Sequence, residues 1–320
     1  MAPEQALGAL RRQLSQRILG QQSLVDRLLV ALLADGHLLV EGAPGLAKTQ
    51  AIRSLCEHLE ADFHRVQFTP DLLPADITGS DIYRPESGQF HFQKGPLFHN
   101  LVLADEINRA PAKVQSALLE AMAERQVTVG QTTYPLDSLF LVMATQNPIE
   151  QEGTYPLPEA QLDRFLMHLR IGYPQARHER EILHLARQEQ RGEMPVNALT
   201  ITREQLFSAR RSVADTYMSE AVEDYLLALI LASRGQGPHG EAIGPFISFG
   251  ASPRGSIALD RCARALAWLE GRDYVTPDDI RALAGDVLRH RILLTFEAEA
   301  EGLTSDDLIE RLLDRVPVSV

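Results

Sequence analysis

Apolar residues in the first half of the chain alternate between helical and strand-like spacing. Leucine and isoleucine recur every three or four positions through residues 4–34, which predicts two helices with an interruption at Gly20. Helices are also expected at about 48–59 and over 114–122. Short apolar runs predict five strands, at 37–41, 63–68, 101–104, 139–145 and 166–171. Strands that alternate with helices favour a parallel α/β sheet.

Other segments depart from this alternation. A stretch rich in proline and glycine, about residues 68–98, contains an alternating run at 89–92 and predicts an inserted hairpin. A smaller hairpin is expected at 127–134. After residue 173 the pattern is helical, and we expect no further strands. The predicted organisation is an α/β core over residues 1–173 and an all-helical domain over residues 174–320.

The composition is that of a globular protein. Hydrophobic residues make up 45% and charged residues 23% of the 320 positions, which excludes disorder as the main state. We expect no membrane span, because every apolar run is far shorter than the roughly 20 residues that a spanning helix needs. We also expect no secretory signal, because the first residues lack a basic segment followed by an apolar one.

Charge and cysteine content narrow the partners and the compartment. The formal net charge of −12 argues against nucleic acid as the default partner, since nonspecific binding to phosphates depends on lysine and arginine. The two cysteines, Cys56 and Cys262, are far apart, and we interpret both as free, buried thiols. This usage favours a cytoplasmic location.

A glycine-containing loop between the first predicted strand and the next helix is a candidate phosphate site. It comprises Gly42, Ala43, Pro44, Gly45, Leu46, Ala47, Lys48 and Thr49. In such a loop backbone N–H groups and the helix N-terminus face the anion, the lysine reaches the outer phosphates and the threonine hydroxyl holds Mg²⁺. Ala47 stands where the usual pattern has glycine, and we expect alanine to be tolerated only at a negative φ. The alternative is an ordinary glycine turn before a helix.

Polar residues follow two later strands. Asp105 and Glu106 end the third predicted strand, where the first carboxylate can hold Mg²⁺ through water and the second can orient an attacking water. Acidic residues also start many ordinary helices. Asn147 follows the fourth strand and brings an amide to the same edge, although an asparagine before Pro148 also suits a plain turn.

Two arginines are candidates for a more distant role. Arg164 is expected on a short helix before the last strand, and Arg254 at a helix start in the helical half. Each alone is also compatible with an ordinary surface arginine.

Together these motifs resemble the MoxR family of AAA+ ATPases. The resemblance rests on the phosphate loop and on the runs 105–115, 144–148 and 158–165, and it covers nearly the whole chain. It implies a P-loop AAA+ core with a parallel sheet and a helical lid. The same resemblance assigns Lys48 and Thr49 to Walker A, Asp105 and Glu106 to Walker B, and Asn147 to sensor 1.

The resemblance also suggests roles for residues outside the loop. Gly20 and Gln21 belong to a segment similar to the one that packs on adenine. Arg164 is implied to reach the nucleotide of a neighbouring subunit, with Arg109 as the alternative candidate, and Arg254 is implied to be sensor 2 from the lid.

The implied function is Mg²⁺-dependent ATP hydrolysis by a homo-oligomeric, hexameric ring. In this family the ring has a chaperone-like role on a protein client, often a metalloenzyme, together with a von Willebrand factor A domain partner. Two alternatives remain at this point: a motor that acts on nucleic acid, and a non-catalytic, nucleotide-dependent scaffold. The net charge disfavours the first, and the presence of Glu106 and Arg164 disfavours the second.

Overall fold

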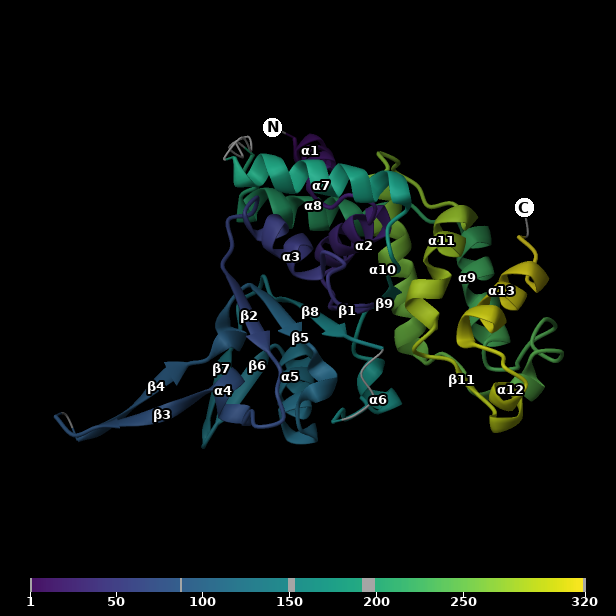
Figure 1. Ribbon diagram of the computed structural model, residues 1–320. Coiled ribbons are helices and arrows are strands. Elements are labelled where there is room, and N and C mark those ends of the chain that lie inside the picture. Colours follow the sequence, from purple (N-terminus) through teal and green to yellow (C-terminus); the bar gives the residue numbers. More distant parts are fainter. Residues whose placement is uncertain (1, 87, 149–152, 192–198, 319–320) are drawn as a thin grey trace.

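A five-stranded sheet is the centre of the computed structural model, which describes residues 2–86, 88–148, 153–191 and 199–318 (Figure 1). In spatial order the strands are β2 (Phe63–Gln67), β5 (Leu101–Asp105), β8 (Leu141–Gln146), β1 (Leu38–Glu41) and β9 (Met167–Arg170). Neighbouring strands pair in parallel, so their carboxyl ends lie along one edge. The predicted strands and the parallel α/β fold are confirmed.

Helices precede the sheet and connect its strands. The first two are α1 (Pro3–Arg17) and α2 (Gln22–Leu33), and the predicted interruption at Gly20 has a φ of 74°. The connections contain α3 (Lys48–Cys56), the 3₁₀ turns η1 (Pro96–Phe98) and η2 (Ile107–Arg109), α5 (Ala112–Glu124) and α6 (Glu159–Leu162). The helix expected at 48–59 therefore ends three positions early.

Both expected hairpins are present. Strands β3 (Gly79–Arg84) and β4 (Gln89–Lys94) form the inserted one, which extends away from the body of the molecule (Figure 1). A short helix that was not predicted, α4 (Pro74–Thr78), precedes it. The second hairpin is β6 (Gln126–Val129) with β7 (Thr132–Pro135). Phe92 stacks on Tyr134 with ring centroids 4.0 Å apart, which connects the two hairpins.

Where the structure describes the second half of the chain, it is helical apart from one short strand pair. Its helices are α7 (Ala176–Gln190), α8 (Arg203–Ala214), α9 (Glu220–Ala232), α10 (Pro253–Leu269), α11 (Pro277–Leu288), α12 (Phe296–Ala300) and α13 (Ser305–Arg315), with the 3₁₀ turn η3 (Gly244–Phe246). The expectation of no strands here is wrong, because β10 (Ile247–Phe249) and β11 (Leu293–Leu294) form an antiparallel pair. Segments this short carry too few residues to distinguish strand alternation from helical spacing.

One apolar cluster joins the two halves. Buried residues of α2, such as Leu28, belong to the same cluster as Leu259 and Cys262 of α10. The predicted domain boundary at residue 173 thus divides the chain without dividing the core, and it stays a prediction. Both cysteines are free, but only Cys262 is buried, whereas Cys56 is partly exposed. No helix in the described part of the chain is both long and apolar enough to cross a membrane.

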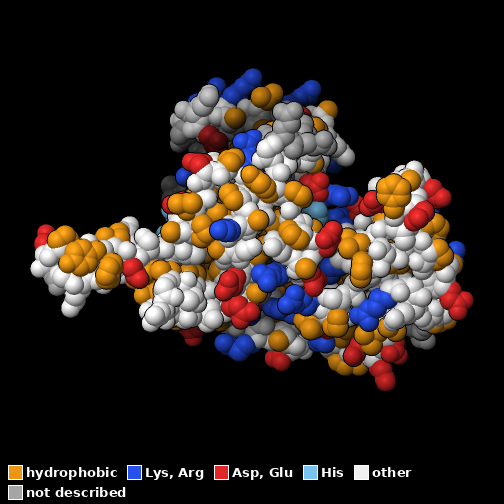
Figure 2. Space-filling model, turned by 90° about the horizontal axis from the view of Figure 1, so that it is seen from below, with side chains coloured by type: hydrophobic (Ala, Val, Ile, Leu, Met, Phe, Trp, Pro, Cys, Tyr) orange, Lys and Arg blue, Asp and Glu red, His pale blue; other side chains and the backbone are white. Residues whose placement is uncertain are grey.

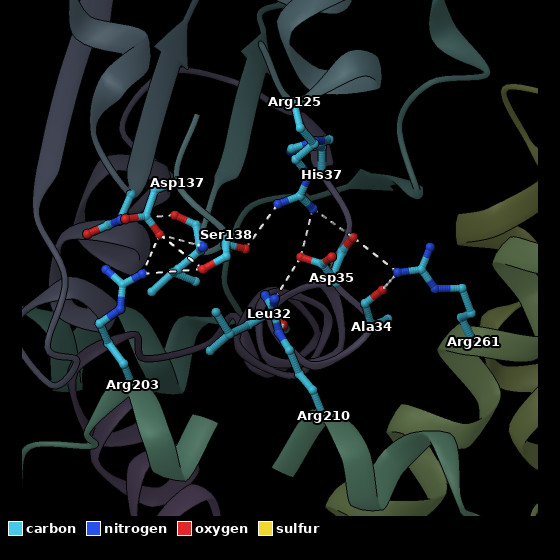
Figure 3. A network of polar contacts seen from close by, with 12 residues as sticks. Leu32, Ala34, Asp35, His37, Arg125, Asp137, Ser138, Arg203, Arg210 and Arg261 are labelled. Carbon is cyan, nitrogen blue, oxygen red and sulfur yellow. Dashed lines mark hydrogen bonds and ion pairs between the residues drawn. The ribbon is translucent and has the colours of Figure 1, made fainter. Parts of the chain in front are cut away.

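Charged groups at the turn after α2 connect the sheet to two helices of the second half (Figure 3). Asp35, with a φ of 52°, contacts Arg125 and Arg210 through Oδ1 at 2.7 Å each. Burial alone would raise the pKa of Asp35, but the guanidiniums of Arg210 and Arg125 hold it below its ordinary value. Arg261 of α10 donates to the carbonyl of Ala34. This turn therefore fixes α8 and α10 to the sheet.

A second connection is a buried ion pair. Arg291, whose side chain is 2% exposed, follows α11 and donates from Nε to Asp163 Oδ1 at 2.8 Å. Its other nitrogens donate to the carbonyls of Phe165 at 2.6 Å and Leu166 at 3.2 Å. Asp163 Oδ2 accepts from Ser252 Oγ at 3.0 Å, at the start of α10. The segment before β9 is thus held against both α10 and α11.

We expect Arg291→Met to lower the free energy of unfolding by about 3 kcal/mol or more, because it removes the cation beside the Asp163 carboxylate and the guanidinium donor of several carbonyls. A matched control is Arg203→Met, which removes an ion pair whose partners are 34% and 35% exposed. That variant should lose at most about 1 kcal/mol. Urea unfolding of both proteins measures the difference, and equal losses would contradict the structural weight given to the Asp163–Arg291 pair.

Candidate functional site

Two adjoining cavities open along the loop 42–49 that connects β1 to α3. The first, here called the polar cleft, has a volume of about 410 Å³ and charged lining residues that include Lys48, Arg65, Asp105 and Glu106. The second, the apolar cavity, has a volume of about 340 Å³. Residues 44–47 of the loop line both. A ligand with one anionic end and one apolar end could therefore span the loop.

The loop reverses direction through left-handed residues. Gly45 has a φ of 83°, and Ala47 has a φ of 59° with a ψ of 16°. The expectation that alanine requires a negative φ here is wrong, since Ala47 adopts the left-handed region at a cost of roughly 1–2 kcal/mol. The turn allows α3 to begin at Lys48, beside the polar cleft. The free N–H groups of a helix N-terminus attract anions.

Lys48 is held inside the loop. Its side chain is nearly buried, and Nζ donates to the carbonyl of Gly42 at 2.5 Å. Burial lowers the pKa of Lys48, while the nearby charges of Asp105 and Glu106 act in the opposite direction. The ammonium thus lies where a phosphate group would add a further counter-charge.

Asp105 ends β5 with both carboxylate oxygens engaged. Thr145 of β8 donates from Oγ1 to Oδ1 at 2.5 Å. Arg65 of β2 donates to Oδ2 from Nε at 3.1 Å and from Nη2 at 2.7 Å. The carboxylate therefore has a fixed orientation that neighbours on both adjacent strands enforce.

Glu106 follows directly in a strained conformation. Its φ of 57° lies in the left-handed region, which points the chain out of the strand and into η2. Oε2 accepts from Gln67 Nε2 at 2.8 Å and lies 3.0 Å from Arg109 Nε. Its backbone N–H donates to Thr145 Oγ1 at 2.9 Å. Thr145 thus contacts both acidic residues of the site.

The oxygen ligands needed for Mg²⁺ are gathered in the polar cleft. Thr49, Asp105 and the buried Asn147 all line it. Hydroxyl, carboxylate and amide oxygens are the hard donors that Mg²⁺ prefers, and a cleft of this volume leaves room for the waters that it retains. The residues present therefore fit this metal.

The apolar cavity is lined by the segment around Gly20 and Gln21, which the family resemblance places against adenine. Gln21 is buried and donates from Nε2 to the carbonyl of Gly172 at 2.7 Å. A Cβ at Gly20 would lie 2.8 Å from Pro174 Cβ, so glycine is required there for close approach as well as for its positive φ. Leu19 and residues of α7 complete the apolar lining, namely Ile182, Leu185 and Ala186.

Arg164 and Arg254 lie together, away from the loop. They line a separate cavity of about 390 Å³ with residues 35–37, which immediately precede β1. The loop follows β1, and a strand of four residues spans roughly 13 Å. Arg254 Nη1 lies 3.7 Å from Asp163 Oδ2. The structure thus brings the two arginines together at the amino ends of the strands and places neither in the polar cleft of the same chain.

One placement differs from the expectations in detail. Arg164 does not lie on the short helix, because α6 ends at Leu162. Arg109, the alternative to Arg164, contacts Glu106 of its own chain. Arg254 does lie at a helix start, since α10 begins at Pro253.

Sequence reasoning missed three residues that contact the acidic pair: Arg65, Gln67 and Thr145. Each is a polar residue near the carboxyl end of a predicted strand, which is the signal that could have found them.

Comparisons with known proteins agree with this architecture. Residues 37–167 match the model of the ATPase family associated with various cellular activities (AAA), and residues 241–312 match that of the AAA lid domain. The chain is 47% identical to Chaperone MoxR1 of Mycobacterium tuberculosis, over 93% of this chain and 78% of that protein. It is 32% identical to Protein MoxR of Methylorubrum extorquens, over 98% and 95% respectively. A crystal structure of a candidate ATPase from Cytophaga hutchinsonii has a TM-score of 0.89 at 44% identity, over 99% of this chain and 96% of that one.

Proposed function

The chain belongs to the MoxR family of AAA+ ATPases, and on that premise we propose that it hydrolyses ATP with Mg²⁺ at the interfaces of a homo-oligomeric ring, a hexamer by resemblance. The observation that carries the proposal is the division of the site, with the loop and acidic pair at one edge of the sheet and two arginines at the other. A complete site then needs two copies of the chain.

In this proposal the polar cleft takes the phosphates and the apolar cavity takes the base. Lys48 and the N-terminus of α3 bind the β- and γ-phosphates. Mg²⁺, when bound, neutralises phosphate charge, and Thr49 and Asp105 hold it. Glu106 accepts the proton of the attacking water, and Asn147 helps to position that water.

The arginines act on the neighbouring subunit. Arg164 and Arg254 come from one surface, since Arg164 follows Asp163, and Asp163 contacts both Ser252 at the start of α10 and Arg254. As a pair they face the γ-phosphate of the next copy, where a trans arginine is worth on the order of 10³–10⁵ in rate in other phosphoryl-transfer enzymes. The second copy thereby regulates hydrolysis through its position.

The output of the cycle is remodelling of a protein client. The β3–β4 hairpin supports this, since apolar side chains gather at its end (Figure 2), where Ile82, Tyr83 and Phe90 are 45%, 53% and 71% exposed. A projecting apolar surface of this kind suits contact with protein. A von Willebrand factor A domain partner, a metalloenzyme client and a cytoplasmic location are part of the same proposal, by family resemblance and composition. The net charge of −12 disfavours the alternative of a nucleic-acid motor.

Nucleotide binding should depend on the lysine of the loop. We expect Lys48→Ala to lose tight binding of ATP, because the loop itself would then offer the phosphates only backbone dipoles in place of a charged donor. Isothermal titration calorimetry measures the affinity. Wild-type affinity in this variant would contradict the assignment of the loop.

Glu106→Gln should bind ATP normally and hydrolyse it poorly, since an amide can orient water but cannot accept its proton. Unchanged turnover would place the base elsewhere.

The Glu106→Gln variant should also hold ATP and client together. We expect a client protein to be recovered with Glu106→Gln but not with the control Lys48→Ala/Glu106→Gln, which cannot bind ATP tightly. If DNA instead stimulates the turnover of the wild-type protein, the nucleic-acid motor is favoured.

Mixing experiments test the shared site. Lys48→Ala and Arg164→Ala are each expected to be inactive, but in an equal mixture about a quarter of the interfaces combine an intact loop with an intact arginine. ATP hydrolysis should therefore recover to roughly that fraction of wild-type activity and rise with protein concentration. Lys48→Ala mixed with Arg254→Ala should behave in the same way.

A mixture of Arg164→Ala with Arg254→Ala is the matched control. No interface in it receives both arginines, so it should stay inactive. If native mass spectrometry shows mixed rings and the first mixture does not recover, the trans role of Arg164 is wrong and Arg109 becomes the next candidate.

A further inference from the structure

Arg65 occupies the metal side of the polar cleft, and nothing in the proposed mechanism uses it. It lies on β2 at the edge of the sheet and lines the cleft together with Lys48, Thr49 and Asp105. Two of its guanidinium nitrogens donate to Asp105 Oδ2, at 3.1 and 2.7 Å. Nη2 also donates to Gln67 Oε1 at 2.8 Å.

This arrangement conflicts with a metal ion at the same carboxylate. Thr145 engages Oδ1 of Asp105 and Arg65 engages Oδ2, so both oxygens already have donors. A hydrated dication needs one of these oxygens and is repelled by an adjacent guanidinium. The Arg65 contact and a metal at Asp105 therefore compete, because the guanidinium neutralises the charge that would attract the dication and occupies an oxygen that would accept from its waters.

The two partners differ in their freedom to move. The side chain of Asp105 is 13% exposed and is held by the strand and by Thr145, whereas the side chain of Arg65 is 49% exposed. Of the two contacts on the carboxylate, the one from Arg65 is thus the easier to break. The Arg65 side chain can rotate toward solvent without disturbing the core.

We propose that Arg65 is an internal substitute for Mg²⁺, which neutralises Asp105 in the metal-free site and is displaced when the metal binds. This inference rests on the proposed function, since it requires that Asp105 holds the metal. Arg65 is then a positioning residue that sets the affinity for Mg²⁺, because its contact lowers the fraction of molecules in which Asp105 is free to take the metal.

The test measures metal binding without turnover. Mn²⁺ serves as the probe for the Mg²⁺ site. The protein is in excess over ADP, so that the nucleotide is bound, and electron paramagnetic resonance measures the concentration of free Mn²⁺. Arg65→Ala should bind Mn²⁺ about tenfold more tightly than wild type, because two hydrogen bonds to a charged group no longer compete. Arg65→Lys should fall between them, since lysine keeps the charge without the paired geometry.

For nucleotide binding without metal, the same variant should change affinity in the opposite direction. In EDTA the Asp105 charge of Arg65→Ala is unopposed by the guanidinium, so a fluorescent ADP analogue should bind more weakly than to wild type. One variant should thus gain affinity for the metal and lose affinity for metal-free nucleotide. A misfolded protein would lose both.

Arg53→Ala is the matched control, because Arg53 lines the same cleft and is exposed but its removal leaves the Asp105 contact in place. Its Mn²⁺ affinity should stay within about twofold of wild type. Unchanged or weaker Mn²⁺ binding by Arg65→Ala, or an equal gain in Arg53→Ala, would overturn the inference. Absence of nucleotide binding by the wild-type protein would instead overturn the proposed function.

Discussion

The register of the parallel strands is the constraint on which the site depends. Gln67 of β2 lies beside Asp105 of β5, and Ala104 lies beside Ala144 of β8, so Thr145 is next to Asp105 on its other side. A shift of one residue in either pairing would turn these side chains to the opposite face of the sheet. The acidic pair is thus oriented by the hydrogen-bond ladder of the sheet, and the buried apolar stretches of β5 and β8 fix that ladder in the core.

The same sheet separates the two groups of residues that the proposed reaction needs. Because β1 carries the loop at one end and borders the arginine cavity at the other, the proposed site is incomplete on each edge of a single chain. The buried pair of Asp163 and Arg291 gives the arginine edge its rigidity, since it holds the segment of Arg164 against α10 and α11. A rigid surface matters in trans catalysis because an arginine misplaced by about 1 Å loses much of its effect.

Local patterns in the sequence were enough to predict the five strands of the central sheet and the positions of the loop and the acidic pair, because apolar runs and short motifs encode them within a few residues. The left-handed conformation of Ala47 could not be predicted in this way, since it is imposed by the fold of the loop around it and not by the residue itself. Arg65 lies 40 positions from Asp105, and only the pairing of β2 with β5 brings them together. The strand pair β10 and β11 is equally non-local, with too few residues to leave a period in the sequence.

Local charge in the cleft differs in sign from the charge of the whole chain. The chain carries −12, yet the polar cleft is lined by three cationic side chains, Lys48, Arg53 and Arg65, against the two carboxylates Asp105 and Glu106. An acidic protein can therefore present a site that favours phosphate while its overall field repels polyanions such as DNA. The arginine on Asp105 is part of that balance, because without it two adjacent carboxylates would face the incoming phosphates whenever the metal is absent. In the proposed cycle, a cation that leaves when the metal arrives keeps the site attractive to the nucleotide in both states.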